Sequence, residues 1–298
     1  MKFGKVAAPE RIDFEMKTPP AEVQKEQQAA GKAPIYIGAT GWSMKEWVGK
    51  WYAPGTKTVG FLKEYGRLFN TIELNTTHYR IPTLEQVEKW CEQVPDDFRF
   101  CPKIPQRISH AKNMGLGTGL IAQTTEAFDR FGIKMGCCFV QLPPYFGADR
   151  LELLRLFLEA WPKSLPLAVE FRHESWFADE SVINRWHELL TAHQTTAVIT
   201  DVAGRRDVLH MRVTTNKTMV RWVGNGLIES DYERLSDWVE VLSYWKLAET
   251  YIFPHQPDNV QAPEAAAWLA ERLQETDWAD TRGPKVYVEP PPDQLALF

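Results

Sequence analysis

Short apolar runs rich in β-branched and aromatic residues recur along the chain from residue 35 onward. They lie at residues 35–39, 71–75, 98–103, 137–142, 167–171, 196–201, 219–223 and 250–254. Their length and composition predict β-strands. Between them, apolar residues recur at intervals of three and four, which predicts amphipathic helices. Leu84, Val87, Cys91 and Val94 show this spacing.

Helix start signals support the alternation. Thr83 and Gln86 form a capping-box pattern ahead of one predicted helix, as do Ser230 and Glu233 ahead of another. Pro263 occupies a favoured first-turn position of the last predicted helix. Eight strands alternating with helices over about 250 residues predict an α/β fold, a single (β/α)8 TIM-type barrel.

The domain organisation follows from the ends of this pattern. Residues 1–34 are polar and predict an N-terminal pendant arm, partly disordered, with one short helix. Residues 35–289 form the predicted barrel, and residues 290–298 a Pro-rich C-terminal tail. An open doubly wound sheet is the structural alternative. The glycines at 115, 117 and 119 do not support it, because they lie in a loop without the strand–helix context of a dinucleotide site.

Composition narrows the classes of function. The net charge of −5 excludes a generally basic nucleic-acid coat, although a local basic mouth is compatible with it. Four cysteines without C-x-x-C spacing predict reduced thiols and a cytoplasmic protein. No apolar run approaches transmembrane length and no signal peptide is evident, so we expect no membrane partner. Nothing in the sequence predicts the oligomeric state.

Polar residues gather where the predicted strands end. Ala168, Glu170 and Arg172 share one face of a buried strand, and unpaired charge is costly in such a place. Active sites of (β/α)8 barrels form at the carboxyl ends of the strands. Reading those ends gives catalytic candidates Glu73, Glu170, Asp201, His110 and His255, and substrate-binding candidates Trp42, Asn75, Tyr79, Lys103, Gln141, Arg172, His173, Arg221 and Asn259.

Structural roles remain open for each candidate. Glu73 is equally compatible with a buried ion pair to Arg172 or Arg221, and Asp201 with a helix cap. Glu170 and Arg172 together are compatible with a purely structural layer of the barrel. His255 is equally suited to hydrogen-bond a neighbouring loop.

Five separated motifs in order resemble the YecE-like family of domains of unknown function, over about residues 35–290. They are Gly38-x-x-Gly41-Trp42-Ser43, Glu73-x-Asn75-x-x-x-Tyr79, the loop from Lys103 to His110, Glu170-Phe-Arg-x-x-Ser175-Trp176 and Phe253-Pro-His-Gln-Pro-Asp-Asn259. The resemblance implies a TIM-type barrel, similar in outline to xylose isomerase and endonuclease IV barrels, but no activity. The family's seventh strand ends in an Arg-x-His-Gly-like run, whereas this chain reads Arg221-Trp222-Val223-Gly224.

The C-terminal residues form a separate motif. Gln294, Leu295, Leu297 and Phe298 resemble the peptide by which bacterial proteins dock on the DNA-polymerase sliding clamp. A polyproline-like stretch at residues 290–292 would hold this peptide away from the barrel. Docking on a clamp is therefore one expectation, and a tail folded on its own barrel is the other.

Three functions stay open on this evidence. The favoured one is a hydrolase-like barrel that binds an anionic substrate, a phosphorylated molecule or a nucleic acid, through Lys103, Arg107, Arg172 and Arg221. A divalent metal is compatible with the carboxylates and histidines but is not required, and no spacing names its ligands. The alternatives are a carbohydrate-active barrel with Glu73 and Glu170 as paired carboxylates, and a non-catalytic binding adaptor.

Overall fold

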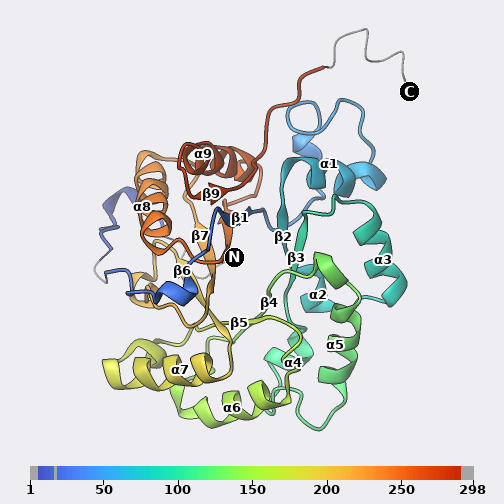
Figure 1. Cartoon of the computed structure of the whole chain (residues 1–298). Helices are drawn as coiled ribbons and strands as arrows, with labels where there is room; N and C mark the ends of the chain where they lie inside the picture. Colours follow the sequence, from blue (N-terminus) through green and yellow to red (C-terminus); the bar gives the residue numbers. More distant parts are fainter. Residues whose placement is uncertain (1–5, 17–18, 290–298) are drawn as a thin grey trace.

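The structure, a computed structural model, describes residues 6–16 and 19–289. Strands and helices alternate around a ring (Figure 1). The strands are β1 (Ala33–Ile37), β2 (Thr71–Leu74), β3 (Arg99–Pro102), β4 (Cys138–Gln141), β5 (Leu167–Glu170), β6 (Thr196–Asp201), β7 (Lys217–Val223), β8 (Glu249–His255) and β9 (Ala279–Asp280). The helices are α1 (Phe61–Leu68), α2 (Thr76–Tyr79), α3 (Leu84–Glu92), α4 (Gln106–Ser109), α5 (Leu120–Asp129), α6 (Leu151–Ala160), α7 (Glu180–Ala192), α8 (Glu229–Trp245) and α9 (Ala262–Gln274).

The first eight strands run parallel and close into a barrel. One sheet has the order β4-β5-β6-β7-β8-β1-β9, and β2 pairs with β3 in a second sheet. A parallel bridge between Lys103 and Phe139 joins the two sheets at β3 and β4. The predicted α/β fold with a TIM-type barrel is thus confirmed, and each predicted strand lies within two residues of its observed position.

Side chains complete the closure between β1 and β2. Asn70 accepts a hydrogen bond from Ile37 N at 2.8 Å and donates one to Ile35 O at 2.9 Å, so its amide replaces a strand partner. Glu73 N donates to Ala39 O at 3.1 Å one step further along. Gly38 permits this approach, because a Cβ there would lie 2.2 Å from Thr71 O.

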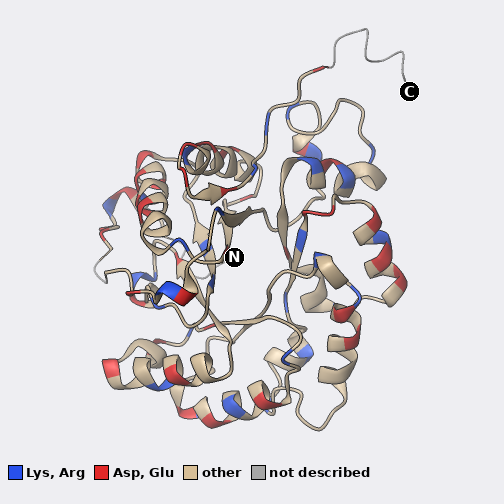
Figure 2. Ribbon diagram, viewed as in Figure 1, with Lys and Arg blue, Asp and Glu red and all other residues tan. Residues whose placement is uncertain are grey.

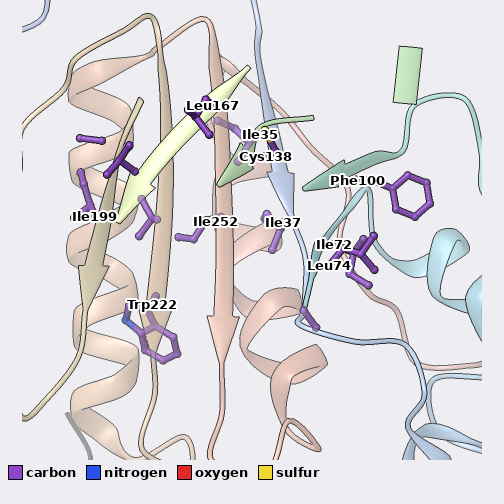
Figure 3. Packing of buried hydrophobic residues seen from close by; sticks show 14 of the residues in the cluster. Ile35, Ile37, Ile72, Leu74, Phe100, Cys138, Leu167, Ile199, Trp222 and Ile252 are labelled. Carbon is purple, nitrogen blue, oxygen red and sulfur yellow. The ribbon is translucent and has the colours of Figure 1, made fainter. Parts of the chain in front are cut away.

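Alternate strand residues face two different environments. Ile35, Ile72, Phe100, Cys138, Leu167, Ile199, Trp222 and Ile252, one from each barrel strand, belong to the large core between strands and helices (Figure 3). The neighbouring residues point into the barrel, where a smaller cluster contains Cys101, Cys137, Phe139, Ala168, Val198, Met219, Tyr251 and Phe253. The alternation therefore identifies, strand by strand, which side chains enter the barrel lumen.

Two helix starts illustrate where local signals succeed and fail. Thr83 caps α3 as predicted, since its hydroxyl accepts from Gln86 N. The capping box predicted at Ser230 is wrong: the N-cap of α8 is Ile228, so Ser230 lies inside the helix, and its buried hydroxyl has no hydrogen-bond partner among the described residues. Instead, the Asp231 carboxylate accepts from the backbone of Asn225 and Leu227 in the preceding loop.

Between residues 19 and 34, the N-terminal segment is not the pendant arm expected from sequence. Ala21 N donates to Met211 O, Ala29 N donates to Lys246 O, and Trp245 Nε1 donates to Ala21 O. Residues 19–34 therefore pack against the barrel at the loops around β7 and β8. The predicted tail residues Gln294, Leu295, Leu297 and Phe298 lie outside the described residues, and clamp docking stays a prediction.

Charged residues of both signs alternate along the outer helices (Figure 2). Among the described residues, no helix combines the length and the apolar character needed to cross a membrane.

All four cysteines are free, as predicted, and Cys137 and Cys138 point to opposite sides of β4.

Candidate functional site

Polar residues occupy the lumen at the carboxyl ends of the strands. Glu73 on β2, Glu170 on β5 and Arg221 on β7 all continue the inward-facing series, and their side chains are at most 1% exposed. Below them lies the Phe139 ring, whose centroid is 5.6 Å from the Arg221 guanidinium carbon. The side chains therefore form a buried polar layer above an apolar floor.

A single guanidinium joins the two carboxylates. Arg221 Nε and Nη2 donate to Glu73 Oε2 and Oε1 at 2.8 and 2.9 Å, a bidentate pair. Arg221 Nη1 donates to Glu170 Oε2 at 2.7 Å. The sequence left open whether Glu73 and Glu170 face one another, and the structure places both against Arg221.

Further residues extend this layer on the Glu170 side. Arg172 Nε donates to Glu170 Oε1 at 2.9 Å, and Gln141 Nε2 donates to Glu170 Oε2 at 2.7 Å. Gln141 in turn accepts a hydrogen bond from Lys103 Nζ at 2.8 Å. The amide of Gln141 thus links an ammonium group to a carboxylate, which requires both of its polar atoms.

Two further residues of the polar layer, Asn75 and His255, contact Glu73. Asn75 Nδ2 donates to Glu73 Oε1 at 2.9 Å, and His255 Nε2 lies 3.0 Å from Glu73 Oε2. His255 comes from the end of β8, and its side chain is 10% exposed. The structure therefore brings together eight of the predicted site residues, namely Glu73, Asn75, Lys103, Gln141, Glu170, Arg172, Arg221 and His255.

The electrostatics of the layer keep both carboxylates charged. Burial alone raises the pKa of Glu73, but Arg221 and His255 outweigh it and hold that pKa well below its usual range. Burial likewise opposes the ionisation of Glu170, but Arg172 and Arg221 lower its pKa to about 2. Burial, with help from Arg221, lowers the pKa of Lys103 to about 8.

Two histidines and a tyrosine border the layer in the loops after β2, β3 and β4. His78 Nδ1 lies 2.9 Å from Ile104 O, and the His78 and His110 ring centroids are 5.5 Å apart. Tyr145 Oη donates to His110 O at 3.1 Å. The sequence placed His78 just beyond the end of the predicted second strand and proposed His110 as a catalytic candidate, but it gave no role to Tyr145.

Asp201 lies apart from the layer. It follows Ile199 in the outward-facing series, and its carboxylate accepts from Trp238 Nε1 at 2.8 Å and pairs with Arg234 at 2.8 Å and with Arg206. Burial opposes its ionisation, but Arg234 lowers its pKa. The lumen position of β6 is occupied by Thr200, which pairs in register with Arg221 and whose buried hydroxyl lacks a hydrogen-bond partner among the described residues.

The other predicted residues surround the mouth without joining the layer. Trp42 packs edge-on against Trp90, and Tyr79 is 78% exposed. His173 Nδ1 accepts from Ser175 N and caps a short 3-10 helix. Asn259 Nδ2 donates to Thr40 Oγ1 at 2.8 Å.

The geometry of this layer bears on metal binding. Within residues 6–16 and 19–289, no group of three or more His, Cys, Asp or Glu side chains converges as a metal site would require. Glu73 and Glu170 direct their oxygens at Arg221 rather than at a shared point. The donor set of the layer therefore fits a guanidinium and does not fit a divalent ion.

Comparison with known proteins agrees with the architecture. A DUF72 family protein of Enterococcus faecalis superposes with a TM-score of 0.66 at 21% identity, over 84% of this chain and 98% of the other. A DUF72 family protein of Thermotoga maritima superposes with a TM-score of 0.64 at 26% identity, over 81% and 99% of the two chains.

Sequence comparison gives the family directly. The UPF0759 protein YecE of Escherichia coli is 32% identical over 81% of this chain and 93% of its own length. The UPF0759 protein YunF of Bacillus subtilis is 29% identical over 48% and 52% of the two chains. Residues 36–287 match the family described as "Protein of unknown function DUF72". The resemblance inferred from the five sequence motifs is thus confirmed, and this chain belongs to the DUF72 family.

Proposed function

We propose that this protein is a hydrolase that binds a phosphorylated substrate at the carboxyl-terminal mouth of the barrel. The observation that carries the proposal is the charge of the polar layer. Lys103, Arg172 and Arg221 bring three cationic groups to two carboxylates, which leaves one positive charge in excess. A partly buried excess charge of this kind attracts an anion more strongly than a surface charge does.

The cations have different roles in this proposal. Arg221 is committed to both carboxylates through three N–H groups, so it neutralises them rather than binding substrate. Lys103 and Arg172 are the more exposed cations of the layer, each 7% exposed against 1% for Arg221. An ammonium group has three donors, and Lys103 directs one at Gln141. Lys103 and Arg172 are therefore the proposed contacts to the substrate phosphate.

His255 is the proposed general base. Because Glu73 is ionised, its Oε2 accepts the hydrogen bond and the Nε2 of His255 carries the proton. In this tautomer the Nδ1 of His255 has a lone pair and is the atom proposed to accept a proton from water. The resulting hydroxide attacks phosphorus, the ester P–O bond breaks, and the leaving alkoxide takes a proton from solvent water and departs as the alcohol, while the imidazolium later returns its proton to solvent. Glu73 orients the ring and stabilises the imidazolium, as carboxylates do in other catalytic pairs.

The same contacts argue against the carbohydrate alternative. A glycosidase needs two carboxyl groups about 5 to 10 Å apart with the substrate between them. In this protein the guanidinium of Arg221 fills the space between Glu73 and Glu170 and bonds to both.

Binding is tested first, by calorimetry with inorganic phosphate and a panel of phosphomonoesters and phosphodiesters. Arg172→Met and Lys103→Met are expected to weaken binding by 10-fold or more, as the loss of a charge-assisted contact of about 1.5–3 kcal/mol implies. Arg155→Met is the matched control, because Arg155 is an exposed arginine on α6 that pairs with Glu152 and Glu159. No binding to any phosphorylated ligand would overturn the proposal.

Turnover is tested with His255→Gln. Glutamine keeps a donor for Glu73 and lacks the ring base, so hydrolysis is expected to fall about 10²- to 10⁴-fold. Phosphate affinity should change little. Phosphate binding by the wild type without turnover of any ester would reject the hydrolase and support the non-catalytic adaptor.

We also propose a cytoplasmic location, since all four cysteines are free thiols.

A further inference from the structure

A continuous row of aromatic rings borders the mouth on one side. The rings of Tyr79 and His78 are 5.3 Å apart, those of His78 and His110 are 5.5 Å apart, and those of His110 and Tyr145 are 6.3 Å apart. These residues belong to the loops that follow β2, β3 and β4, which are neighbouring strands of the barrel. The two ends of the row are the tyrosines, which are 78% and 60% exposed.

The row of aromatic rings carries no charge, although it lies beside the cations Lys103 and Arg172. Burial lowers the pKa of His78 to about 4 and also lowers the pKa of His110, and in both cases Lys103 and Arg172 contribute. Both imidazoles are therefore neutral at pH 7. The row also lies close to the proposed phosphate contact Lys103, because His78 Nδ1 is 2.9 Å from the carbonyl oxygen of Ile104, the next residue in the chain. The mouth thus offers flat neutral rings next to a phosphate-binding centre.

A groove continues outward from Tyr79. It has a volume of about 590 Å³, and its lining residues include Tyr79, Arg80, Arg107 and Glu126. Two arginines against one carboxylate leave this groove positively charged, and both arginines are exposed. The groove and the mouth share the exposed Tyr79 ring, so an extended ligand can pass from one to the other over that ring.

We propose that the anionic ligand of the mouth is a nucleotide unit of a single-stranded nucleic acid. Its phosphate contacts Lys103 and Arg172, its base stacks on Tyr79 or Tyr145, and the next phosphates lie along Arg80 and Arg107. Proteins bind single strands in this way, with aromatic rings beneath the bases and a basic groove along the backbone. Base pairing would hide the faces of the bases, so a duplex does not fit this arrangement. The inference rests on the proposed phosphate site and names its ligand.

The experiment compares four ligands on the full chain. Calorimetry measures inorganic phosphate, thymidine and thymidine 5′-monophosphate, and fluorescence anisotropy measures a labelled oligothymidylate of about six nucleotides. Tyr79→Leu and Tyr145→Leu are expected to weaken oligonucleotide binding roughly 5- to 150-fold while leaving phosphate binding unchanged. Tyr79→Phe keeps the ring and should retain the affinity. Tyr244→Leu is the control, because Tyr244 is another exposed tyrosine, 54% exposed, on α8.

The groove has an independent readout in salt. A single-strand phosphate contact contributes about −0.7 to the slope of log K against log salt concentration. Arg107→Gln should therefore make the oligonucleotide slope shallower by about 0.7, with no effect on inorganic phosphate. Thermal denaturation of each variant checks that the fold is intact.

The outcomes separate this inference from the proposed function. Phosphate binding without tighter binding of the nucleotide or the oligonucleotide would overturn the inference and leave the phosphate site standing. Tighter binding of the monophosphate alone, with the oligonucleotide no better and the Arg107→Gln slope unchanged, would reject the strand and the groove. Failure of all phosphorylated ligands would overturn the proposed function itself. Equal losses from Tyr244→Leu and Tyr79→Leu would reject the stacking role.

Discussion

Arg221 holds Glu73 in a bidentate ion pair that spans the barrel lumen, with Nε and Nη2 at 2.8 and 2.9 Å from the two carboxylate oxygens. The two residues are 148 positions apart and come from β7 and β2. Both are within 1% of full burial. Because Arg221 also binds Glu170, this one side chain links three strands. It neutralises both carboxylates, so Lys103 and Arg172 are left as the proposed contacts to an anion.

Removing the guanidinium should destabilise the barrel strongly. Arg221→Met leaves two buried carboxylates without their shared partner, and breaking a buried pair in this way costs about 3–5 kcal/mol. Urea denaturation measures the change in the free energy of unfolding. Arg155→Met on the exposed face of α6 is the control and should change it by less than about 0.5 kcal/mol. Equal effects of the two substitutions would contradict the central role of Arg221.

The approach of β1 to β2 depends on one glycine. A methyl group on residue 38 would lie 2.2 Å from Thr71 O. Thr71 O is a backbone atom, so it cannot relieve the contact by a change of rotamer. Gly38→Ala should therefore destabilise the protein by about 1–3 kcal/mol or more. Gly41→Ala is the matched control, since nothing lies within 4 Å of the added carbon there. Thermal unfolding of both variants measures the difference, and a stable Gly38→Ala protein would argue against this closure.

Asp201 should act on stability and not on ligand binding. Asp201→Asn removes the charge that Arg234 and Arg206 share in the layer between β6 and α8, so unfolding should become easier by about 3 kcal/mol. Phosphate affinity of the folded variant should match the wild type within about twofold, because the carboxylate points away from the lumen. A selective loss of phosphate binding or turnover in a stable variant would restore Asp201 as a candidate for catalysis.

Phosphate affinity should fall as the pH rises through about 8. Burial lowers the pKa of Lys103 to about 8, so the free protein loses this positive charge above that pH. A bound anion favours the protonated form, and the affinity is therefore highest below pH 8 and weaker above it. Calorimetry between pH 6.5 and 9.5 follows the change, with Lys103→Arg as the comparison. The arginine variant should show no such decline, and an equal decline in both proteins would assign it to another group.

Several features were predictable from the sequence because they depend on neighbours along the chain. Short runs rich in β-branched and aromatic residues predicted every barrel strand, and the two-residue spacing of Glu170 and Arg172 predicted that both point the same way at the end of β5. The rule that barrel sites form at the carboxyl ends of the strands then led to fourteen polar or aromatic candidates, eight of which lie together in the polar layer of the structure. Each of these inferences needs only the two-residue repeat of a strand or the turn repeat of a helix.

The capping box at Ser230 failed because tertiary contacts overrode a local signal. The Asp231 carboxylate accepts hydrogen bonds from the backbone of the loop that follows β7, and these contacts determine where α8 begins. The N-terminal segment was misjudged for a similar reason. Its composition is that of a solvated arm, but its backbone groups find partners near Met211 and Lys246 far along the chain.

The sequence by itself determined the order of strands and helices and the set of residues that share a strand face. It did not determine which face is the inside. Asp201 and Thr200 are neighbours on β6, and only packing against α8 shows that Asp201 points outward and Thr200 inward. Likewise, the pairing of Arg221 with Glu73 and Glu170 follows from closing the strands into a ring. Periodicity acts between neighbours in the chain, whereas the charge balance of the mouth depends on contacts across the lumen.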